Sequence, residues 1–472
     1  MIPPLNTSSG PPFPQRRSLL QSAAAGFGWL AFQALAARPA GADEVAALKT
    51  DATDKSPLTP RPPHFPARAK RVIFLFMQGA PSHLETFDWK PQLKERHGKT
   101  AGNAANRGKL LAPQFDFQPR GNSGLPISSL FPQLSRHADN LCLLNGLHTS
   151  NAAHPQATIA LHTGSINFVR PSLGAWVTYG LGSTNQNLPG FVTLNPSGPG
   201  GAQNYGSSFL PASYQGTRVQ PEAGGIADIR TPHQTPGAQR TQIDLVQQLN
   251  RNLLGKHPGN AELEGVIQSY ELAFRMQTSV PEVLDLRSES AATLTRYGID
   301  NKETAAFGRQ CLMARRLAEA GVRFIQITRG GWDQHRDLRE ALQRNCTAID
   351  QPIAGLLQDL SDRDLLRDTL VIWGGEFGRS PQEQASGGDG RRHNNLGFSM
   401  WMAGGGVRGG FRYGATDELG EKAVENRMST HDLHATILHL LGLDHTRLTY
   451  RYAGRDFRLT DVYGEVATGI LS

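Results

Sequence analysis

Polar residues that could bind a metal or an anion follow three apolar runs of the sequence, each at the point where the run ends. The first run leads into the stretch 78–88, and the second leads into Asp333 and His335. The third leads into Glu376, and His393 lies in the glycine-rich segment beyond it. Ligands of parallel α/β sheets bind outside the carboxyl ends of the strands, so these residues are expected to meet at one edge. The three runs are residues 71–76, 322–327 and 370–373.

Carboxylates and imidazoles together suit a divalent metal, because hard and borderline cations take oxygen and nitrogen donors. Asp333 and His335 are two residues apart, so in an extended segment both side chains share a face and could reach one ion. Glu376 follows a buried strand, where a carboxylate must be paired, hydrogen-bonded or metal-bound. The alternatives are a turn aspartate beside a structural histidine, and a salt bridge between Glu376 and Arg379. We predict a divalent metal site, with Zn²⁺, Ca²⁺ and Mg²⁺ all left open, and its ligands are Asp333, His335, Glu376 and His393.

His154 and Arg379 are the candidate catalytic residues. His154 opens a predicted helix, where free backbone N–H groups favour an anion, so its imidazole could contact a phosphate or sulfate group. The alternative for this lone histidine is a helix cap or a group that supports a metal ligand from behind. Arg379 has the planar fork that clamps such anions, unless it pairs with Glu376.

The composition narrows the class of ligand. Removing three arginines that lie before residue 43 lowers the formal charge of the 472-residue chain from +7 to +4, which weakly favours anionic ligands. The basic residues are scattered and no nucleic-acid-binding motif is present, so no nucleic-acid partner is expected. The sequence has no G-x-S-x-G motif and no P-loop.

Residues 1–42 have the order of a secretory signal. Arg16 and Arg17 precede an apolar run at 19–37, and small residues follow at 40–42. Residues 15–21 resemble a twin-arginine signal, which implies the twin-arginine export machinery as a partner and a periplasmic or secreted protein. The alternative is an N-terminal membrane anchor. No other run reaches the ~20 apolar residues of a spanning helix, so no stable membrane span is expected after cleavage.

The rest of the chain divides into a proline-rich linker at 43–70 and one domain at 71–465. Strand-like and helix-like patterns alternate along the domain, which favours a parallel sheet covered on both faces. A loop-rich insertion around 165–245 could wall a pocket or merely decorate the surface. Three widely spaced cysteines predict buried thiols, although one disulfide remains open. Further strands are expected at 141–144 and 398–402, and helices at 130–137, 156–162, 242–276, 302–320, 348–360 and 432–441.

The sequence resembles the domain of unknown function 1501 family, a branch of the alkaline phosphatase/sulfatase superfamily. The resemblance rests on VIFLFMQGAPSHLETFD, GGWDQH, VIWGGEFGRSP, the HNN…GGGVRGG loop and DLHATILHLLGL, and it covers nearly the whole chain after the leader. It implies an alkaline phosphatase-like α/β fold, with a doubly wound, mostly parallel sheet and helices on both faces. It also implies a metal-supported site that hydrolyses phosphate or sulfate esters, in which Asp333, His335, Glu376 and His393 match metal-ligand positions.

Three positions depart from the superfamily pattern. The metal-binding aspartate of the first strand falls at Gln78, so His83, Glu85 or Asp88 would have to substitute for it. The histidine of the superfamily's Asp-His pair falls at Phe377, which cannot coordinate a metal. The nucleophile position falls at His154, which could form a covalent phospho-intermediate or position a metal-activated water, but cannot become formylglycine.

Two hypotheses of different classes follow. The first is an exported, metal-dependent hydrolase acting on an anionic small-molecule or polysaccharide ester. The second is a catalytically inactive, secreted binding or scaffold protein that kept the fold and lost the nucleophile. Fold alone does not decide between them, because function lies in the site.

Overall fold

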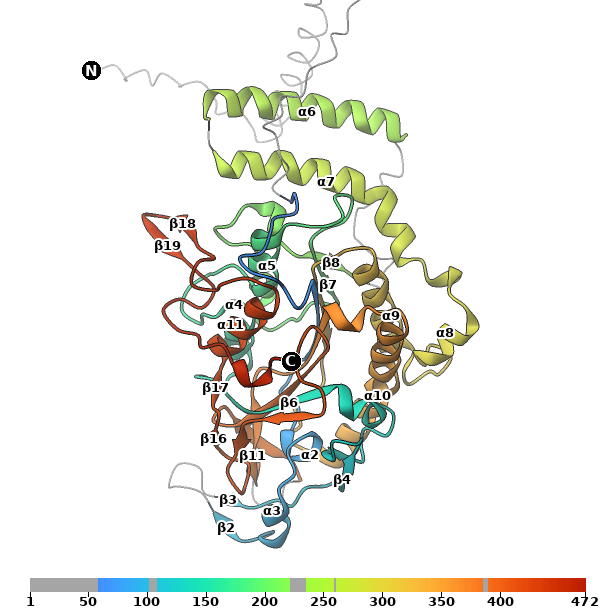
Figure 1. Ribbon diagram of the computed structural model, residues 1–472, viewed down its shortest axis with the longest axis vertical. Helices are drawn as coiled ribbons and strands as arrows, with labels where there is room; N and C mark the ends of the chain where they lie inside the picture. Colours follow the sequence, from blue (N-terminus) through green and yellow to red (C-terminus); the bar gives the residue numbers. More distant parts are fainter. Residues whose placement is uncertain (1–57, 102–107, 221–234, 259, 385–388) are drawn as a thin grey trace, which may run out of the picture. The chain divides into compact units, whose positions relative to one another are not determined.

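The computed structural model of the chain describes residues 58–101, 108–220, 235–258, 260–384 and 389–472. Its core is a nine-stranded sheet in the order β14-β6-β13-β10-β1-β9-β7-β8, with β17 paired to β6 (Figure 1). Each strand runs parallel to its neighbours except β13, which is antiparallel to β10 and β6. The predicted, mostly parallel α/β sheet is therefore confirmed. The strands are β1 (Arg71–Met77), β6 (Leu141–His148), β7 (Phe191–Leu194), β8 (Thr217–Val219), β9 (Phe324–Arg329), β10 (Thr369–Gly374), β13 (Phe398–Ala403), β14 (Phe411–Tyr413) and β17 (Met428–Ser429).

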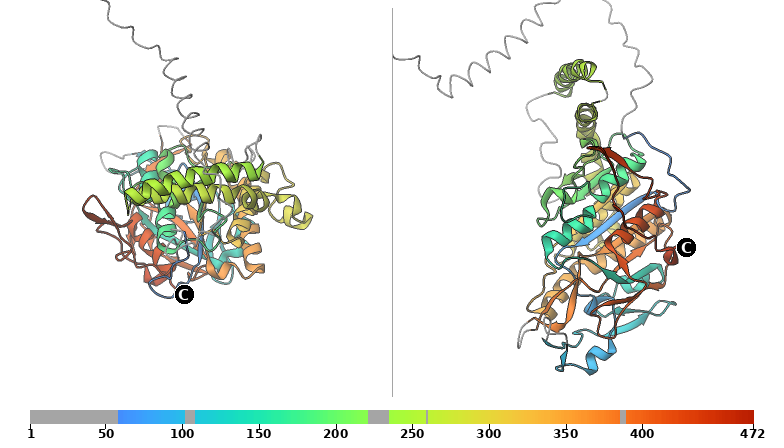
Figure 2. Two further views of the ribbon diagram at one scale, coloured as in Figure 1. Left: turned by 90° about the horizontal axis from the view of Figure 1, so that it is seen from above. Right: turned by 90° about the vertical axis from the view of Figure 1, so that its left-hand side faces the viewer.

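Helices cover both faces of this sheet, as expected of a doubly wound fold. The helices α9 (Ala305–Glu319) and α10 (Leu338–Asp362) pack against each other on one face, and α9 contacts β9 and β1. On the other face lie α4 (His154–Thr163), α5 (Leu173–Leu181) and α11 (Thr430–Leu440), as Figures 1 and 2 show. Because both faces are covered, the central strands β1 and β10 are apolar and buried along almost their whole length.

The segment 165–245, expected to be a loop-rich insertion, contributes to the core instead. It contains α5, β7 and β8, and β7 pairs in parallel with β9. The strand β7 has only four residues, all buried, and a run this short carries no reliable periodic signal. The helical region predicted at 242–276 divides into α6 (Pro236–Lys256) and α7 (Ala261–Leu284).

The remaining expected helices are present with shifted ends. The helix expected at 130–137 is a 3₁₀ helix, η1 (Leu134–Asn140), and those expected at 156–162, 302–320, 348–360 and 432–441 correspond to α4, α9, α10 and α11. Short helices and two-stranded ribbons complete the described part of the chain. They are α2 (His83–Thr86), α3 (Pro91–Glu95), α8 (Ala291–Arg296), β2 (Thr100–Ala101), β3 (Gly108–Lys109), β4 (Phe117–Arg120), β5 (Leu125–Ser128), β11 (Gly378–Glu383), β12 (Arg391–Asn394), β15 (Ala415–Thr416), β16 (Ala423–Glu425), β18 (Tyr450–Tyr452), β19 (Arg455–Phe457), η2 (Gly201–Asn204), η3 (Ala212–Tyr214), η5 (Leu286–Ser288), η6 (Leu366–Asp368) and η7 (Thr468–Ile470).

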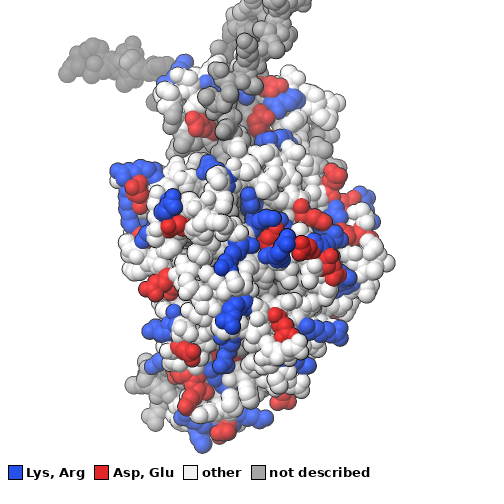
Figure 3. Space-filling model, viewed as in Figure 1, with Lys and Arg blue, Asp and Glu red and all other residues white. Residues whose placement is uncertain are grey.

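The predicted leader at 1–42 lies outside the described residues, as does most of the predicted linker. Its described part, from residue 58, is held against the domain, because Arg61 N–H bonds Leu181 O and Ala69 N–H bonds Leu440 O. None of the described helices is both long enough and apolar enough to cross a bilayer. On the face shown in Figure 3, basic and acidic side chains are interspersed.

The three cysteines are buried and free, as predicted for core thiols. Burial raises the pKa of Cys142 to about 12, so its thiol stays protonated at neutral pH.

Candidate metal centre

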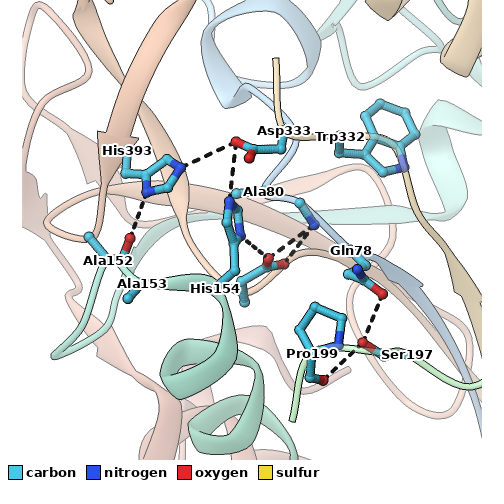
Figure 4. Close-up of polar contacts among 12 residues, drawn as sticks. Gln78, Ala80, Ala152, Ala153, His154, Ser197, Pro199, Trp332, Asp333 and His393 are labelled. Carbon is cyan, nitrogen blue, oxygen red and sulfur yellow. Dashed lines mark hydrogen bonds and ion pairs between the residues drawn. The ribbon is translucent and has the colours of Figure 1, made fainter. Parts of the chain in front are cut away.

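Three histidines and one aspartate meet at the carboxyl edge of the sheet. Asp333 and His335 follow β9, and His154 is the first residue of α4, which begins shortly after β6. His393 lies on β12, directly opposite Arg379 in the register of the β11–β12 hairpin. One ligand atom from each of His154, Asp333 and His393 lies within 4.8 Å of the others, and Figure 4 shows their side chains converging.

Each imidazole is oriented through its Nδ1 atom by an oxygen acceptor. The Nδ1–H of His154 donates to Glu376 Oε1 at 2.5 Å, and that of His393 donates to the carbonyl oxygen of Ala152 at 2.7 Å. The Nδ1–H of His335 donates to Gln384 Oε1 at 2.9 Å. With the proton of each neutral ring on Nδ1, the Nε2 atom carries a lone pair.

The three Nε2 atoms face a single carboxylate oxygen. Asp333 Oδ1 lies 2.9 Å from Nε2 of His335 and 3.2 Å from Nε2 of both His154 and His393. The Nε2 atoms of His335 and His393 are only 2.9 Å apart. The lone pairs of these two atoms repel each other unless a proton or a cation lies between them. The four side chains are therefore stable in this arrangement only with a positive charge among them.

This donor set fits a divalent metal ion. Metal-bound histidines nearly always donate their second ring N–H to a carboxylate or a carbonyl oxygen, which is the pattern of all three rings here. Several imidazoles with one carboxylate suit Zn²⁺ and neighbouring transition metals better than Mg²⁺ or Ca²⁺, which prefer oxygen ligands. The Asp333 side chain is 46% exposed and that of His335 is 32% exposed, so solvent and ligands reach the cluster.

The electrostatics show how tightly these groups are coupled. Burial alone would lower the pKa of His154, but hydrogen bonds to Asp333 and Glu376 outweigh it and raise the pKa to about 9. Burial would raise the pKa of Asp333, but hydrogen bonds from His154, His393 and Arg379 hold it well below its usual range. Burial and the nearby Arg379 lower the pKa of His335, so this ring is neutral at neutral pH.

Arg379 is a buried clamp within the protein. Its side chain is fully buried, and it donates to Asp333 Oδ1 at 2.6 Å, to Gly79 O at 2.5 Å and to Ala80 O at 2.9 Å. These bonds join the end of β1 to the segment that carries Asp333. In the described structure Arg379 bonds Asp333 Oδ1 and backbone oxygens, and its side chain has no exposed surface that a substrate could contact.

Glu376 is also fully buried and lies behind His154. Its carboxylate accepts the Gly79 N–H at 3.0 and 3.2 Å besides the bond from His154. A salt bridge between Glu376 and Arg379 was the alternative considered from the sequence, but Arg379 pairs with Asp333 instead. Glu376 was predicted as a metal ligand, but its carboxylate contacts Nδ1 of His154. The Nε2 atom on the opposite side of that ring is the one that faces the cluster.

The first-strand residues considered as substitute ligands bond elsewhere. His83 bonds the carbonyl oxygen of Gly420, Glu85 pairs with Arg391, and Asp88 pairs with Lys90. Gln78 accepts a hydrogen bond from Ser197 at 2.8 Å. Phe377 packs its ring 4.7 Å from that of His154 and 4.8 Å from that of His393. Its aromatic ring therefore fixes two of the imidazoles, although it cannot bind a metal.

Asp333, His335 and His393 were predicted from the sequence to share one site, and they meet here. Three groups that support them were not predicted. Gln384 and the carbonyl oxygen of Ala152 orient two of the rings, and no sequence motif marks either. Gly79 has φ +113°, and a Cβ there would lie 2.6 Å from the Asp333 nitrogen. Of these three groups, only Gly79 could have been inferred from the sequence, because a glycine at a strand end indicates that another backbone segment approaches too closely for a side chain.

A family model described as protein of unknown function (DUF1501) matches residues 69–471, nearly the whole described chain. The chain belongs to this family. The family resemblance noted from the sequence is therefore confirmed. A comparison with curated proteins finds no match.

The chain is also similar in fold to several solved structures. The lipoteichoic acid synthase LtaP from Listeria monocytogenes matches at 9% identity and a TM-score of 0.37, over 86% of this chain and 79% of that one. The alkaline phosphatase from the Antarctic bacterium TAB5 matches at 10% identity and a TM-score of 0.33, over 80% and 99%. The phosphonate monoester hydrolase SpPMH from Silicibacter pomeroyi matches at 13% identity and a TM-score of 0.34, over 79% and 73%. Similarity this low transfers neither residue roles nor an activity.

Proposed function

We propose that this protein is an exported, metal-dependent hydrolase of anionic esters, of which phosphate and sulfate esters are the leading classes. The observation that carries the proposal is the convergence of three imidazole Nε2 atoms on Asp333 Oδ1 while each Nδ1 atom is bonded outward. In this proposal the ligands are His154, Asp333, His335 and His393. Glu376 is then a group that orients His154, and Arg379 is one that orients Asp333.

The charges at the site favour an anionic ligand. The buried groups Arg379 and Glu376 carry opposite charges, and Asp333 adds one negative charge. A bound divalent cation therefore leaves the site with one net positive charge. Such a cation can polarise an ester oxygen and lower the pKa of a bound water.

The attacking group in this proposal is water. Both ring nitrogens of His154 are engaged, Nδ1 with Glu376 and Nε2 with the cluster, so the ring has no free nitrogen with which to form a covalent phospho-intermediate. His154, at the superfamily's nucleophile position, is therefore proposed as a ligand.

A non-catalytic binding protein is the second candidate, and one observation favours it. Gln78 occupies the first-strand position and bonds Ser197, and Phe377 occupies another ligand position, so two of the superfamily's donors are absent. A single cation without those donors could hold an anion without hydrolysing it.

A panel of p-nitrophenyl phosphate, phosphonate and sulfate esters separates the two candidates. The protein is loaded with Zn²⁺ or Mn²⁺, and hydrolysis is compared among wild type, Asp333→Ala and His257→Ala, whose histidine is exposed and directly follows α6. The hydrolase proposal predicts turnover of at least one ester class, lost in Asp333→Ala and retained in His257→Ala. A metal-loaded wild type that binds these anions but turns over none of them contradicts it and supports the binding protein.

A further inference from the structure

Helix α6 has the reverse of the usual amphipathic arrangement. An amphipathic helix normally turns its apolar stripe towards the protein and its polar face towards solvent. In α6, all 21 residues of which are described, the only buried residue is the polar Gln247. Three leucines of the same helix are largely exposed, Leu245 at 56%, Leu249 at 59% and Leu253 at 47%.

The inner face of α6 is held to α7 by polar contacts. Arg240 pairs with Glu271 of α7 through hydrogen bonds of 2.9 and 3.0 Å. Gln247 donates to the same carboxylate at 3.2 Å and to the carbonyl oxygen of Ile267 at 2.7 Å. At 3.6 residues per turn, Arg240 and Leu249 lie on opposite sides of the helix. The leucines therefore face away from α7, and Figures 1 and 2 show α6 on the outer side of α7.

The exposed stripe continues into an apolar groove. The groove, of about 460 Å³, is lined by Ile243 and Val246 of α6 and by Tyr270 and Phe274 of α7. Contiguous apolar surfaces of this kind on soluble proteins mark interaction sites more often than chance exposure does.

The stripe is self-complementary. Gln242, Leu245, Leu249, Leu253 and Lys256 follow one another at spacings of three, four, four and three residues, a pattern that is symmetric about Leu249. A two-fold axis at Leu249 sets a second α6 antiparallel to the first, so Leu245 of each copy lies opposite Leu253 of the other. Lys256 then meets the neutral Gln242, whereas a parallel arrangement would set two Lys256 ammonium groups against each other.

We propose that α6 and α7 form the dimer interface of this protein, in which the leucine stripe of one copy packs antiparallel on that of a second copy. A two-fold contact requires one surface that is complementary to itself, and the symmetric spacing provides it. The four helices then stack in the order α7, α6, α6, α7, with the two leucine stripes in contact at the centre. This inference is independent of the metal centre.

The chemistry of the stripe disfavours other occupants. Lys256 is its single charged residue, so it offers no patch for a nucleic acid or a strongly acidic partner. Helices that lie on membranes combine basic residues on the outer polar face with aromatic anchors. The described sequence of α6 contains no aromatic residue, and Arg240 faces α7.

Light scattering coupled to size-exclusion chromatography tests the interface on the purified full-length chain. We expect a dimer at micromolar concentration, and Leu245→Asp should raise its dissociation constant by more than about 30-fold. Combining Leu245→Asp with Leu253→Lys in one chain should restore the dimer, because each new carboxylate then lies opposite a new ammonium group of the second copy. The matched control is Val462→Asp, since Val462 is 69% exposed and lies outside α6 and α7.

Circular dichroism of each variant distinguishes loss of the interface from loss of the fold. A monomeric wild type overturns the proposal, and so does a dimer that Leu245→Asp leaves intact. Failure of the double variant to restore a dimer overturns the antiparallel arrangement. Sedimentation of wild type, but not of Leu245→Asp, with phosphatidylcholine vesicles in place of dimerisation would show a membrane surface as the occupant and also overturn it.

Discussion

The orientation of the site residues depends on contacts that no spacing in the sequence reveals. Gly79 illustrates this, because its N–H donates to Glu376 while its carbonyl oxygen accepts from Arg379. One glycine thus links the group behind His154 to the group behind Asp333. The sequence predicted that polar residues would gather at the strand ends. Which ring nitrogen would face inward depended on partners such as Ala152, whose backbone oxygen carries no sequence signal.

Glu376→Gln tests whether the carboxylate acts by orienting His154. A glutamine at this position lacks the negative charge that faces the His154 Nδ1–H. Its NH2 group also replaces Oε2, which accepts from the Gly79 N–H at 3.2 Å, so two donors would face each other there. We expect the dissociation constant for Zn²⁺ to rise about 10- to 100-fold, the usual cost of losing such a supporting group. Competition against a chelating dye measures it, with Glu425→Gln, an exposed site on β16, as the control. An unchanged affinity for Zn²⁺ would show that Glu376 does not support metal binding through His154.

At the scale of elements, strand ends were predictable and strand direction was not. The buried runs at residues 71–76, 322–327 and 370–373 became β1, β9 and β10 in the expected parallel arrangement. The run at residues 398–402 became β13, which is reversed because the β11–β12 hairpin intervenes between it and β10. That same hairpin sets His393 opposite Arg379 and so brings the ring to the cluster. A hairpin formed by polar, arginine-rich residues lacks the alternating apolar signal that predicts strands.

Two buried histidines join elements of the core and predict acid sensitivity. His162 of α4 accepts from Gln326 of β9 at 3.0 Å, and His434 of α11 donates to the carbonyl oxygen of Leu161 at 2.7 Å. Burial lowers the pKa of His162 to about 3 and that of His434 to about 4, against 6.5 for an unperturbed ring. Below pH 6.5 the unfolded chain binds these protons and the folded chain does not, so the stabilisation is lost as the pH falls.

Between pH 7.5 and pH 5, each histidine is expected to lower the free energy of unfolding by about 2 kcal/mol, because each pKa unit corresponds to about 1.4 kcal/mol. Urea unfolding at pH 7.5 and pH 5 measures it in wild type, His162→Gln and His434→Gln. Each variant should show a pH-dependent loss about 2 kcal/mol smaller than that of wild type, whatever its stability at pH 7.5. The exposed His257→Gln serves as the control and should keep the wild-type difference. Equal losses in all four proteins would refute the assignment of these two rings.

Across the molecule, the proposed metal site and the proposed dimer interface lie on separate parts of one fold. The cluster of histidines and Asp333 lies at the carboxyl edge of the sheet, and the leucine stripe lies on α6, outside the sheet. The family and the sheet class followed from the sequence because buried apolar runs and family motifs extend along most of the domain. The exposure of the leucine stripe of α6 could not be predicted from the sequence, because the apolar stripe of a helix normally indicates its buried face.

We propose that the cluster of His154, Asp333, His335 and His393 holds one transition-metal ion. The most direct test is elemental analysis of the purified chain after dialysis against Zn²⁺ and then against metal-free buffer, in parallel with Asp333→Ala, His393→Ala and His257→Ala. We predict one bound ion per chain in wild type and in His257→Ala, and its loss in the other two variants. A wild type that retains no metal, or an Asp333→Ala and a His393→Ala variant that retain as much as wild type, would contradict the account.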